Sequence, residues 1–260
     1  MIITSPENRI YRSCLQLTRK KYRDQRGEYM VEGRKLVEEA FRENVLSVIV
    51  MREDYQGRKE FGACRTLFAA KDLFDRLSQT ETSQGIIGVA EKRDMDSRSF
   101  VKAVSSGGNI LILDRLQDPG NIGTIIRTAD AAGYAGVLTV KGTGDIYSPK
   151  AVRAAAGSIV RLPFFLARDG REAAELAAAG GKRLICTSPA AETDLMDADL
   201  SGGIALVIGN EGSGTSDYFL DRSDETVRIP MNRRVDSLNA AVAAGIFIYQ
   251  SVKDQWEKGR

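Results

Sequence analysis

The segment Asp118–Gly133, DPGNIGTIIRTADAAG, places one arginine inside a predicted helix that starts from a glycine-rich loop. Arg127 could pair with Asp130, three residues further along, and such a solvated pair contributes roughly 0.2–0.5 kcal/mol. It could instead act in an active site, as an anion anchor or as a base. The polar residues elsewhere in the chain must decide between these two interpretations.

The chain contains no histidine, which excludes several kinds of active site. A Ser-His-Asp triad, a Cys-His pair, a histidine general base and H-E-x-x-H metal chemistry are all ruled out. The cysteines, Cys14, Cys64 and Cys186, are odd in number, far apart and form no C-x-x-C pair. We interpret them as buried structural thiols, not as a disulfide framework or a zinc site.

Three loops with residues suited to a ligand follow predicted strands. They are DRLQDPGNIGT after 109–116, GNEGSGTSD after 204–209, and IPMNRRVDSLN after VRIP at 227–230. In a parallel sheet, ligands bind at the loops that follow the carboxyl ends of the strands. The carboxylate of Glu211 can accept hydrogen bonds or pair with an arginine. Taken alone, however, its glycine-rich turn is better explained as a tight connection between a strand and a helix.

The elements around these loops predict an α/β fold. From 107 to 260 the strands and helices alternate, which predicts a parallel sheet covered by helices. Within this region we expect a helix from about 122 to 132 and an extended segment at 158–165. Residues 1–92 predict a smaller α/β domain, and the polar stretch 93–106 predicts a linker.

A basic segment lies near the N-terminus, although the net charge of the whole chain is only +2. Between Arg9 and Arg26 there are seven Arg or Lys residues, one acidic residue and two tyrosines. This pattern suits contact with a phosphate backbone, and it suits a solvated helix face equally well. The chain has no apolar run of the roughly 20 residues that a membrane helix needs, and it opens without the apolar core of a signal peptide. We therefore expect a cytoplasmic protein.

The three loops together resemble a known family. The segments NIGTIIRTADAAG, LVIGNEGSG and IPMNRRVDSLNAAVAA closely resemble the three motifs of the SpoU/TrmH branch of the SPOUT methyltransferases, in the same order and spacing. That resemblance covers most of 107–258. The segment KKYRDQRGEYMVEGRKLVEEA resembles the RNA-binding domain that precedes the catalytic domain in rRNA-modifying members, a domain similar to small ribosomal RNA-binding proteins.

The resemblance implies a function and an assembly. It implies transfer of a methyl group from S-adenosylmethionine to a ribose 2′-hydroxyl of RNA, without a metal. Large-subunit (23S-type) rRNA is the expected substrate because of the N-terminal domain. The resemblance also implies a deep trefoil knot in the C-terminal domain and a homodimer, with each RNA site near the partner subunit.

The resemblance also implies roles for particular residues. The polar active-site positions match Asn121, Arg127, Glu211, Ser237 and Asn239. The methyl donor is expected at Gly209, Asn210, Gly212, Ile229, Ser237 and Leu238. RNA contacts are expected from Arg19, Lys20, Lys21, Arg23, Arg34 and Arg127. The six residues from Asn121 to Arg127 turn a helix through about 600°, so we expect Asn121 in the loop and only Arg127 on the helix.

Arg127 has two possible roles under this resemblance. The family role is to contact the RNA phosphate beside the target ribose and to help deprotonate the 2′-hydroxyl. Because an arginine is effectively always protonated, fixing the phosphate and stabilising the developing alkoxide is the physically easier role. Asn121, Glu211 and Asn239 are expected to organise the loops more than to perform chemistry.

The sequence departs from the family pattern in the third motif and leaves other functions open. Arg233 stands where glycine is usual, and the usual Asn-Val-Ser ending is Asn-Ala-Ala at 239–241. Arg233 and Arg234 could add RNA contacts or crowd the donor loop. The alternatives are a tRNA 2′-O-methyltransferase and a non-catalytic RNA-binding protein that keeps the fold. The missing G-x-G-x-x-G motif argues against a dinucleotide-binding oxidoreductase.

Overall fold

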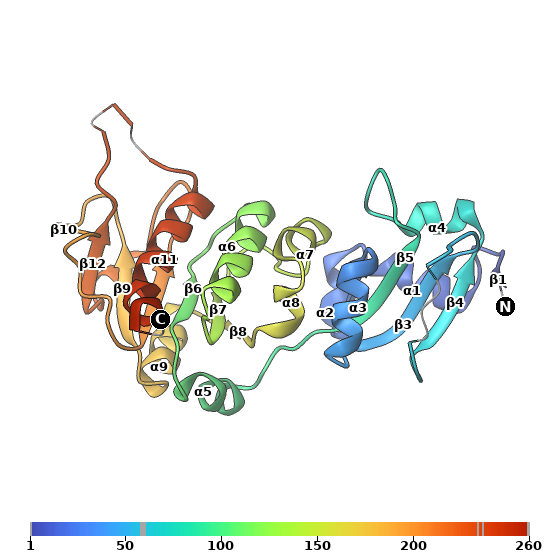
Figure 1. The fold of residues 1–260 in the computed structure, drawn as a ribbon, viewed down its shortest axis with the longest axis horizontal. Coiled ribbons are helices and arrows are strands. Elements are labelled where there is room, and N and C mark those ends of the chain that lie inside the picture. The colour runs from blue at the N-terminus through green and yellow to red at the C-terminus, as the bar shows by residue number, and fades with distance from the viewer. Residues whose placement is uncertain (1, 58–60, 233, 236, 259–260) are drawn as a thin grey trace. The chain divides into compact units, whose positions relative to one another are not determined.

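The structure is a computed structural model that describes residues 2–57, 61–232, 234–235 and 237–258, with side chains up to Lys253. It divides into two compact units, shown in Figure 1. The first consists of Met1–Arg93 and Asp145–Arg161, and the second of Asp94–Gly144 and Leu162–Arg260.

The first unit is built on a five-stranded mixed sheet in the order β1-β4-β3-β5-β2. Strand β5 pairs antiparallel with β2 and β3, and the other pairs are parallel. The strands are β1 (Ile2–Ile3), β2 (Glu28–Glu32), β3 (Leu46–Arg52), β4 (Arg65–Ala69) and β5 (Ile86–Glu91). The helices are α1 (Arg9–Gln16), α2 (Lys20–Arg26), α3 (Arg34–Arg42), α4 (Lys71–Leu77), α7 (Pro149–Ala155) and α8 (Ser158–Arg161).

Helices cover both faces of this sheet. Because side chains alternate along a strand, Val50 and Val89 point to one face, where α1 and α4 bury Cys14 and Phe74 against them. On the other face, α3 buries its apolar stripe against the sheet. The unit therefore has its own core.

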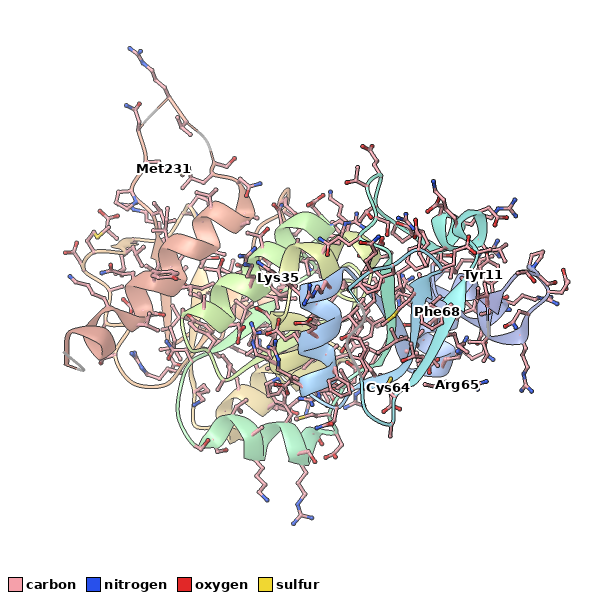
Figure 2. All side chains as sticks on the ribbon, turned by 45° about the vertical axis from the view of Figure 1, so that its right-hand side comes forward. Tyr11, Lys35, Cys64, Arg65, Phe68 and Met231 are labelled. Carbon is pink, nitrogen blue, oxygen red and sulfur yellow. The ribbon has the colours of Figure 1, made fainter. Side chains whose placement is uncertain are left out.

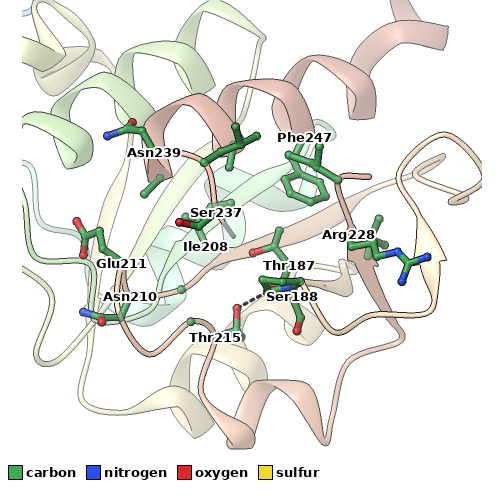
Figure 3. Close-up of a pocket in the computed structure, with 18 of the residues that line it drawn as sticks. Thr187, Ser188, Ile208, Asn210, Glu211, Thr215, Arg228, Ser237, Asn239 and Phe247 are labelled. Carbon is green, nitrogen blue, oxygen red and sulfur yellow. Dashed lines mark hydrogen bonds between the residues drawn. The ribbon is translucent and has the colours of Figure 1, made fainter. Parts of the chain in front are cut away.

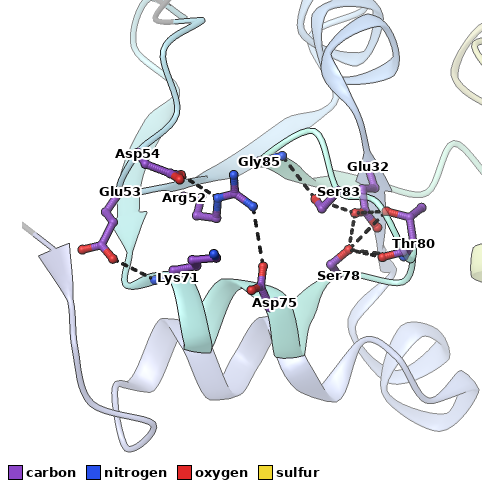
Figure 4. Close-up of polar contacts among 10 residues, drawn as sticks. All are labelled: Glu32, Arg52, Glu53, Asp54, Lys71, Asp75, Ser78, Thr80, Ser83 and Gly85. Atoms are coloured by element: carbon purple, nitrogen blue, oxygen red, sulfur yellow. Dashed lines mark hydrogen bonds and ion pairs between the residues drawn. The ribbon is translucent and has the colours of Figure 1, made fainter.

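A single carboxylate organises the loop between α4 and β5 (Figure 4). Glu32, at the end of β2, accepts hydrogen bonds from the hydroxyls of Ser78, Thr80 and Ser83 at 2.5, 2.8 and 3.0 Å. Its second oxygen accepts from the backbone amide of Gln79 at 2.8 Å. The polar loop is thereby fixed to the sheet.

Residues 145–161 belong to the first unit, although the sequence predicted them in the second domain. Asp145 pairs with the buried Arg23 of α2, and Tyr147 packs on Tyr29 of β2 with ring centroids 4.7 Å apart. These contacts attach α7 and α8 to the N-terminal sheet.

The second unit is a seven-stranded sheet in the order β10-β12-β9-β11-β6-β7-β8, and all its pairs are parallel. This confirms the predicted α/β class. The strands are β6 (Ile110–Leu113), β7 (Gly136–Val140), β8 (Phe164–Ala167), β9 (Arg183–Thr187), β10 (Thr193–Asp194), β11 (Ile204–Ile208) and β12 (Glu225–Arg228). The helices are α5 (Ser97–Ser105), α6 (Pro119–Ala131), α9 (Gly170–Ala179), α10 (Asp217–Leu220) and α11 (Ala240–Lys258).

The central strands of this sheet are covered on both faces. Every residue of β6, β7 and β11 is buried, as expected for a parallel sheet between two helical layers. Helices α5 and α9 bury Phe100, Val104 and Ala173 on one face. Helices α6 and α11 pack against each other (Figure 1). The sheet is therefore a rigid base for the loops at its edge.

Three local predictions were wrong. The predicted linker 93–106 contains α5, because Asp96 caps a helix whose Phe100 and Val104 are buried in the core. The segment 158–165 begins with the short helix α8 and becomes extended only at Phe164. Helix α6 starts at Pro119, ahead of the predicted 122, because the side chain of Asp118 caps it.

Candidate functional site

A cavity of about 600 Å³ opens where four neighbouring strands end (Figure 3). Strands β12, β9, β11 and β6 are adjacent and parallel, so their carboxyl ends meet at one edge of the sheet. Residues from all three predicted loops line the cavity, together with Thr187, Ser188 and Pro189 at the end of β9. Phe247 of α11 also contributes to its lining.

One chain of hydrogen bonds joins the three predicted loops. The carboxylate of Glu211 accepts from the backbone amides of Gln117 and Asp118, each at 3.0 Å, and from the Asn121 side chain at 3.2 Å. The Asn121 side-chain oxygen accepts from Asn239 at 3.1 Å. The first loop is therefore linked directly to both of the others.

Asn239 extends this chain to α11. Its side-chain oxygen accepts from the backbone amides of Ala241 and Val242 at 2.9 and 3.3 Å. These amides lie in the first turn of the helix and have no partner within it. The position of the third loop is thus coupled to the start of α11.

The pKa of Glu211 reflects its hydrogen bonds. Burial raises the pKa of this carboxyl, but the amides of Asp118 and Gln117 and the side chain of Asn121 favour the charged form and leave its pKa below its ordinary value. Glu211 is therefore ionised at neutral pH, the state in which it accepts all three hydrogen bonds.

The second loop is held in shape by its own residues. The side-chain oxygen of Asn210 accepts from the amides of Gly212 and Ser213, while its amide group donates to the Arg115 carbonyl at 2.8 Å. The buried carboxylate of Asp114 accepts from the amide of Ser216 at 2.7 Å. Both contacts fix the second loop against the end of β6.

At Gly209, directly after β11, the backbone of Gly214 and Thr215 passes very close to the chain. A Cβ atom at this position would lie 2.1 Å from the backbone nitrogen of Thr215, so no side chain fits there without moving the loop. Around it, Ile208, Ile229 and Phe247 supply apolar walls to the cavity. The cavity thus combines apolar walls with backbone polar groups and hydroxyls.

The structure brings together most of the residues that the sequence singled out for this site. Those lining the cavity are Asn121, Gly209, Asn210, Glu211, Gly212, Ile229, Ser237, Leu238 and Asn239. Asn121 was expected in a loop and instead lies on α6, because the Asp118 cap brings it into the first turn of the helix. Arg233 lies outside the described residues.

Arg127 does not line this cavity. It lies about 1.7 turns further along α6 than Asn121, because six residues turn a helix by about 600°. This places it on a different, exposed side of the helix. Within the described residues its side chain has neither a hydrogen bond nor an ion pair, so the alternative of pairing with Asp130 is not observed. Its guanidinium is free to meet another molecule.

The predicted RNA-contacting residues of the first unit differ in availability. Arg19, Lys20, Lys21 and Arg34 are exposed. Arg23, by contrast, is only 4% exposed and is held by the Asp145 carboxylate and the carbonyl of Leu17. Its guanidinium cannot reach an RNA phosphate, so its selection as an RNA contact was wrong.

Sequence reasoning missed the fourth loop and two supporting residues. Thr187 ends strand β9 and Ser188 and Pro189 follow it, so the rule that selected the other loops would have found them. Asp114 is the first polar residue after a fully buried strand, which is a similar signal. Phe247 lies within the apolar helix α11 and carries no comparable signal.

The described part of the chain contains neither a metal-ligating cluster nor a membrane-spanning helix. No group of three or more His, Cys, Asp or Glu side chains among those residues could hold a metal ion. Among the described helices, none is long and apolar enough to cross a membrane.

A parallel sheet with loops closing on one cavity defines a ligand-binding α/β domain, and comparison with known proteins defines it further. Residues 108–249 match the model of the SpoU rRNA Methylase family. Residues 8–88 match the MRM3-like substrate binding domain. The chain therefore belongs to the SpoU rRNA methylase family, which confirms the resemblance seen in its motifs.

Individual relatives match along nearly their whole length. The 23S rRNA (guanosine(2553)-2′-O)-methyltransferase RlmP of Bacillus subtilis is 30% identical, over 95% of this chain and 97% of that protein. The crystal structure of an AdoMet-bound rRNA methyltransferase from Sinorhizobium meliloti has a TM-score of 0.86 at 30% identity, covering 98% of each chain. The SpoU methyltransferase AviRb from Streptomyces viridochromogenes, in complex with the cofactor AdoMet, has a TM-score of 0.81 at 27% identity, covering 96% of this chain and 99% of that one.

Proposed function

We propose that this protein transfers a methyl group from S-adenosylmethionine to a ribose 2′-hydroxyl of RNA, with 23S-type rRNA as its substrate. The observation that carries the proposal is the hydrogen-bonded chain from Glu211 through Asn121 to Asn239, which joins three loops around one cavity. The names of the relatives described above support the reaction and the rRNA substrate.

The cavity suits S-adenosylmethionine in size and chemistry. Its volume of about 600 Å³ and its apolar walls of Ile208, Ile229 and Phe247 are suited to a purine ring, because small-ligand sites are mostly apolar. The hydroxyls of Ser188 and Ser237 and the backbone around Gly209 offer polar contacts to the rest of the molecule. When bound, S-adenosylmethionine supplies an electrophilic methyl group on a sulfonium, so the reaction needs only a positioned oxygen nucleophile and a route for its proton.

Arg127 is the residue that we expect to act on the RNA. Since the chain lacks histidine and an arginine keeps its proton, Arg127 would bind the phosphate beside the target ribose and stabilise charge on O2′ while its proton passes to water. The O2′–methyl bond forms as the sulfur–methyl bond breaks, and S-adenosylhomocysteine leaves. Holding O2′ in line with the donor methyl would supply much of the rate. Its exposure and its lack of a partner among the described residues support this role.

We propose a homodimer, in which Arg127 would serve the cavity of the partner subunit. The support is an exposed apolar stripe that begins just before α11 and continues along it: Leu238, Val242, Ile246 and Tyr249 are 37, 53, 37 and 45% exposed. Their spacing of four, four and three residues places them on one side of a helix. Because α11 packs beside α6, a dimer through this stripe would cover the region that carries Arg127.

The two units of the chain would divide the work between RNA binding and methyl transfer. Residues 1–92 would bind the RNA, and the second unit, Asp94–Gly144 and Leu162–Arg260, would carry the methyl transfer. The third loop would take part in the deep trefoil knot of the family. A cytoplasmic location, expected from the sequence, fits an rRNA substrate.

Methyl transfer from radiolabelled S-adenosylmethionine to unmodified rRNA and tRNA tests the proposal. We expect label in 23S rRNA alone. Label in tRNA alone would support the proposed reaction but refute rRNA as the substrate. Absence of label in every RNA and assembly intermediate, with no binding of S-adenosylmethionine, would favour a non-catalytic RNA-binding protein.

A further inference from the structure

The first unit contains a second cavity, which the methyl-transfer site does not use. Its volume is about 430 Å³, within the range of small-ligand sites. It lies between the start of α1 and one end of the sheet, where β2, β3 and β4 begin and the antiparallel β5 ends.

The floor of this cavity is apolar. It includes Cys14 and Val89, each 2% exposed, together with the half-buried Val48. Burial raises the pKa of the Cys14 thiol to about 11, so this side chain stays protonated and acts as an apolar surface. A planar aromatic ring can replace water against such a floor.

One wall of the cavity is an ion pair held in a fixed position. Arg26 lies 2.6 Å from the Glu28 carboxylate and donates a second hydrogen bond to the Ser13 carbonyl at 2.8 Å. The hydroxyl of Ser47 lies 3.3 Å from the other oxygen of Glu28 and 3.3 Å from the Val89 carbonyl, and it can donate to either. Both charged side chains are partly exposed and line the cavity, at 29% for Arg26 and 20% for Glu28.

This wall matches the edge of one RNA base. A carboxylate accepts two parallel hydrogen bonds, and guanine is the RNA base whose Watson–Crick edge presents two adjacent donors, N1–H and the 2-amino group. The neighbouring guanidinium can donate to the guanine oxygen O6. Uracil, cytosine and adenine each lack the second adjacent donor.

The rim of the cavity carries two further cations. Arg9 and Arg65 are exposed and line the cavity, and neither side chain has a hydrogen bond or an ion pair within the described residues. Figure 2 shows Arg65 at the start of β4, next to Cys64 and well separated from Lys35 on α3. Two such guanidinium groups are suited to hold a phosphate.

We infer that this cavity binds an unpaired guanine nucleotide of the RNA, with the base against Glu28 and the phosphate on Arg9 and Arg65. The inference rests on the proposed RNA substrate. Unpaired RNA bases are recognised by inserting them into pockets that read their edges. A ribose 2′-hydroxyl is common to every nucleotide, so a guanine pocket in the first unit would add sequence choice that the chemistry itself lacks.

The test is binding of guanosine 5′-monophosphate to the full-length protein, measured by calorimetry and NMR. Saturating S-adenosylhomocysteine is present throughout, to occupy the other cavity. We expect this nucleotide to bind at least tenfold more tightly than the monophosphates of adenosine, cytidine and uridine. The double variant R9A/R65A should weaken it at least tenfold, and Glu28→Gln should remove the preference for guanine. Lys35→Ala removes an exposed cation from helix α3 and should change binding less than twofold.

Two results would overturn the inference. One is equal binding of all four monophosphates, and the other is unchanged binding in R9A/R65A. Nucleotide binding is measured without turnover, so its failure in a protein that methylates RNA would refute only this cavity. Conversely, a protein that binds guanosine monophosphate as predicted but methylates no RNA would refute the proposed function alone.

Discussion

Replacing Glu211 by alanine should uncouple the three loops around the main cavity. The change removes the acceptor of the hydrogen bonds from Gln117, Asp118 and Asn121. A hydrogen bond to a charged group contributes about 1.5–3 kcal/mol when protected from water. Because Glu211 is exposed, water replaces much of that interaction, and we expect a total loss of about 1–2 kcal/mol.

The free energy lost in Glu211→Ala should also weaken the binding of S-adenosylmethionine. The three loops form the cavity only when they are held together, so a variant with uncoupled loops must spend binding energy on ordering them. A loss of about 1–2 kcal/mol corresponds to a roughly 5- to 30-fold weaker affinity for S-adenosylmethionine. Isothermal titration calorimetry measures this affinity, and urea unfolding measures stability in parallel. Glu192→Ala, which removes an exposed carboxylate outside the cavity lining, is the matched control and should behave as wild type. Wild-type affinity and stability in Glu211→Ala would refute the reasoning.

The stability difference between wild type and this variant should also depend on pH. The fold lowers the pKa of Glu211 below its unfolded value of about 4.3, so its contribution is fully present above that value. It should disappear as the pH falls through the lower, folded-state pKa. A difference that instead grew on acidification would show that the hydrogen bonds favour the neutral form.

Three further changes test other parts of the structure. Gly209→Ala should weaken S-adenosylmethionine binding at least tenfold by calorimetry, because the new Cβ would lie 2.1 Å from a backbone nitrogen. Gly212→Ala is the control: its new Cβ would lie 3.6 Å from the nearest atom, so its affinity should stay within about threefold of wild type. Ser251→Ala removes a buried hydrogen-bond partner of Tyr134 and should lower the free energy of unfolding in urea by about 1–3 kcal/mol. A loss under about 0.5 kcal/mol would show that this hydrogen bond does not stabilise the fold as expected. Val242→Glu should convert a dimer to monomers in light scattering, and an unchanged mass would rule out the proposed interface.

The sequence predicted which loops line the main cavity because a general rule selects them. Ligand loops follow the carboxyl ends of parallel strands, and Glu211 and Asn239 both lie in loops that this rule selects. The position of Asn121 was wrong although its signal was present: Asp118 followed by Pro119 is an N-cap with proline at the first helical position.

Other features depend on partners that are distant in sequence. Arg23 is buried because it meets Asp145, 122 residues away, and nothing near it in the sequence indicates that pairing. Helix α5 was predicted as a linker because its surface is polar, although Phe100 and Val104 have helical spacing. In both cases tertiary packing, which local patterns report only indirectly, determined the outcome.

The position of the transferred methyl group tests the central claim most directly. Wild type and Arg127→Ala would each be incubated with 23S rRNA and S-adenosylmethionine, and the RNA digested to nucleosides for mass spectrometry. We predict one nucleoside carrying its methyl group on the ribose, resistance to alkaline cleavage at that site, and at least a 100-fold slower reaction in Arg127→Ala with donor binding retained. A methyl group on a base, or an undiminished rate in the variant, would contradict the account.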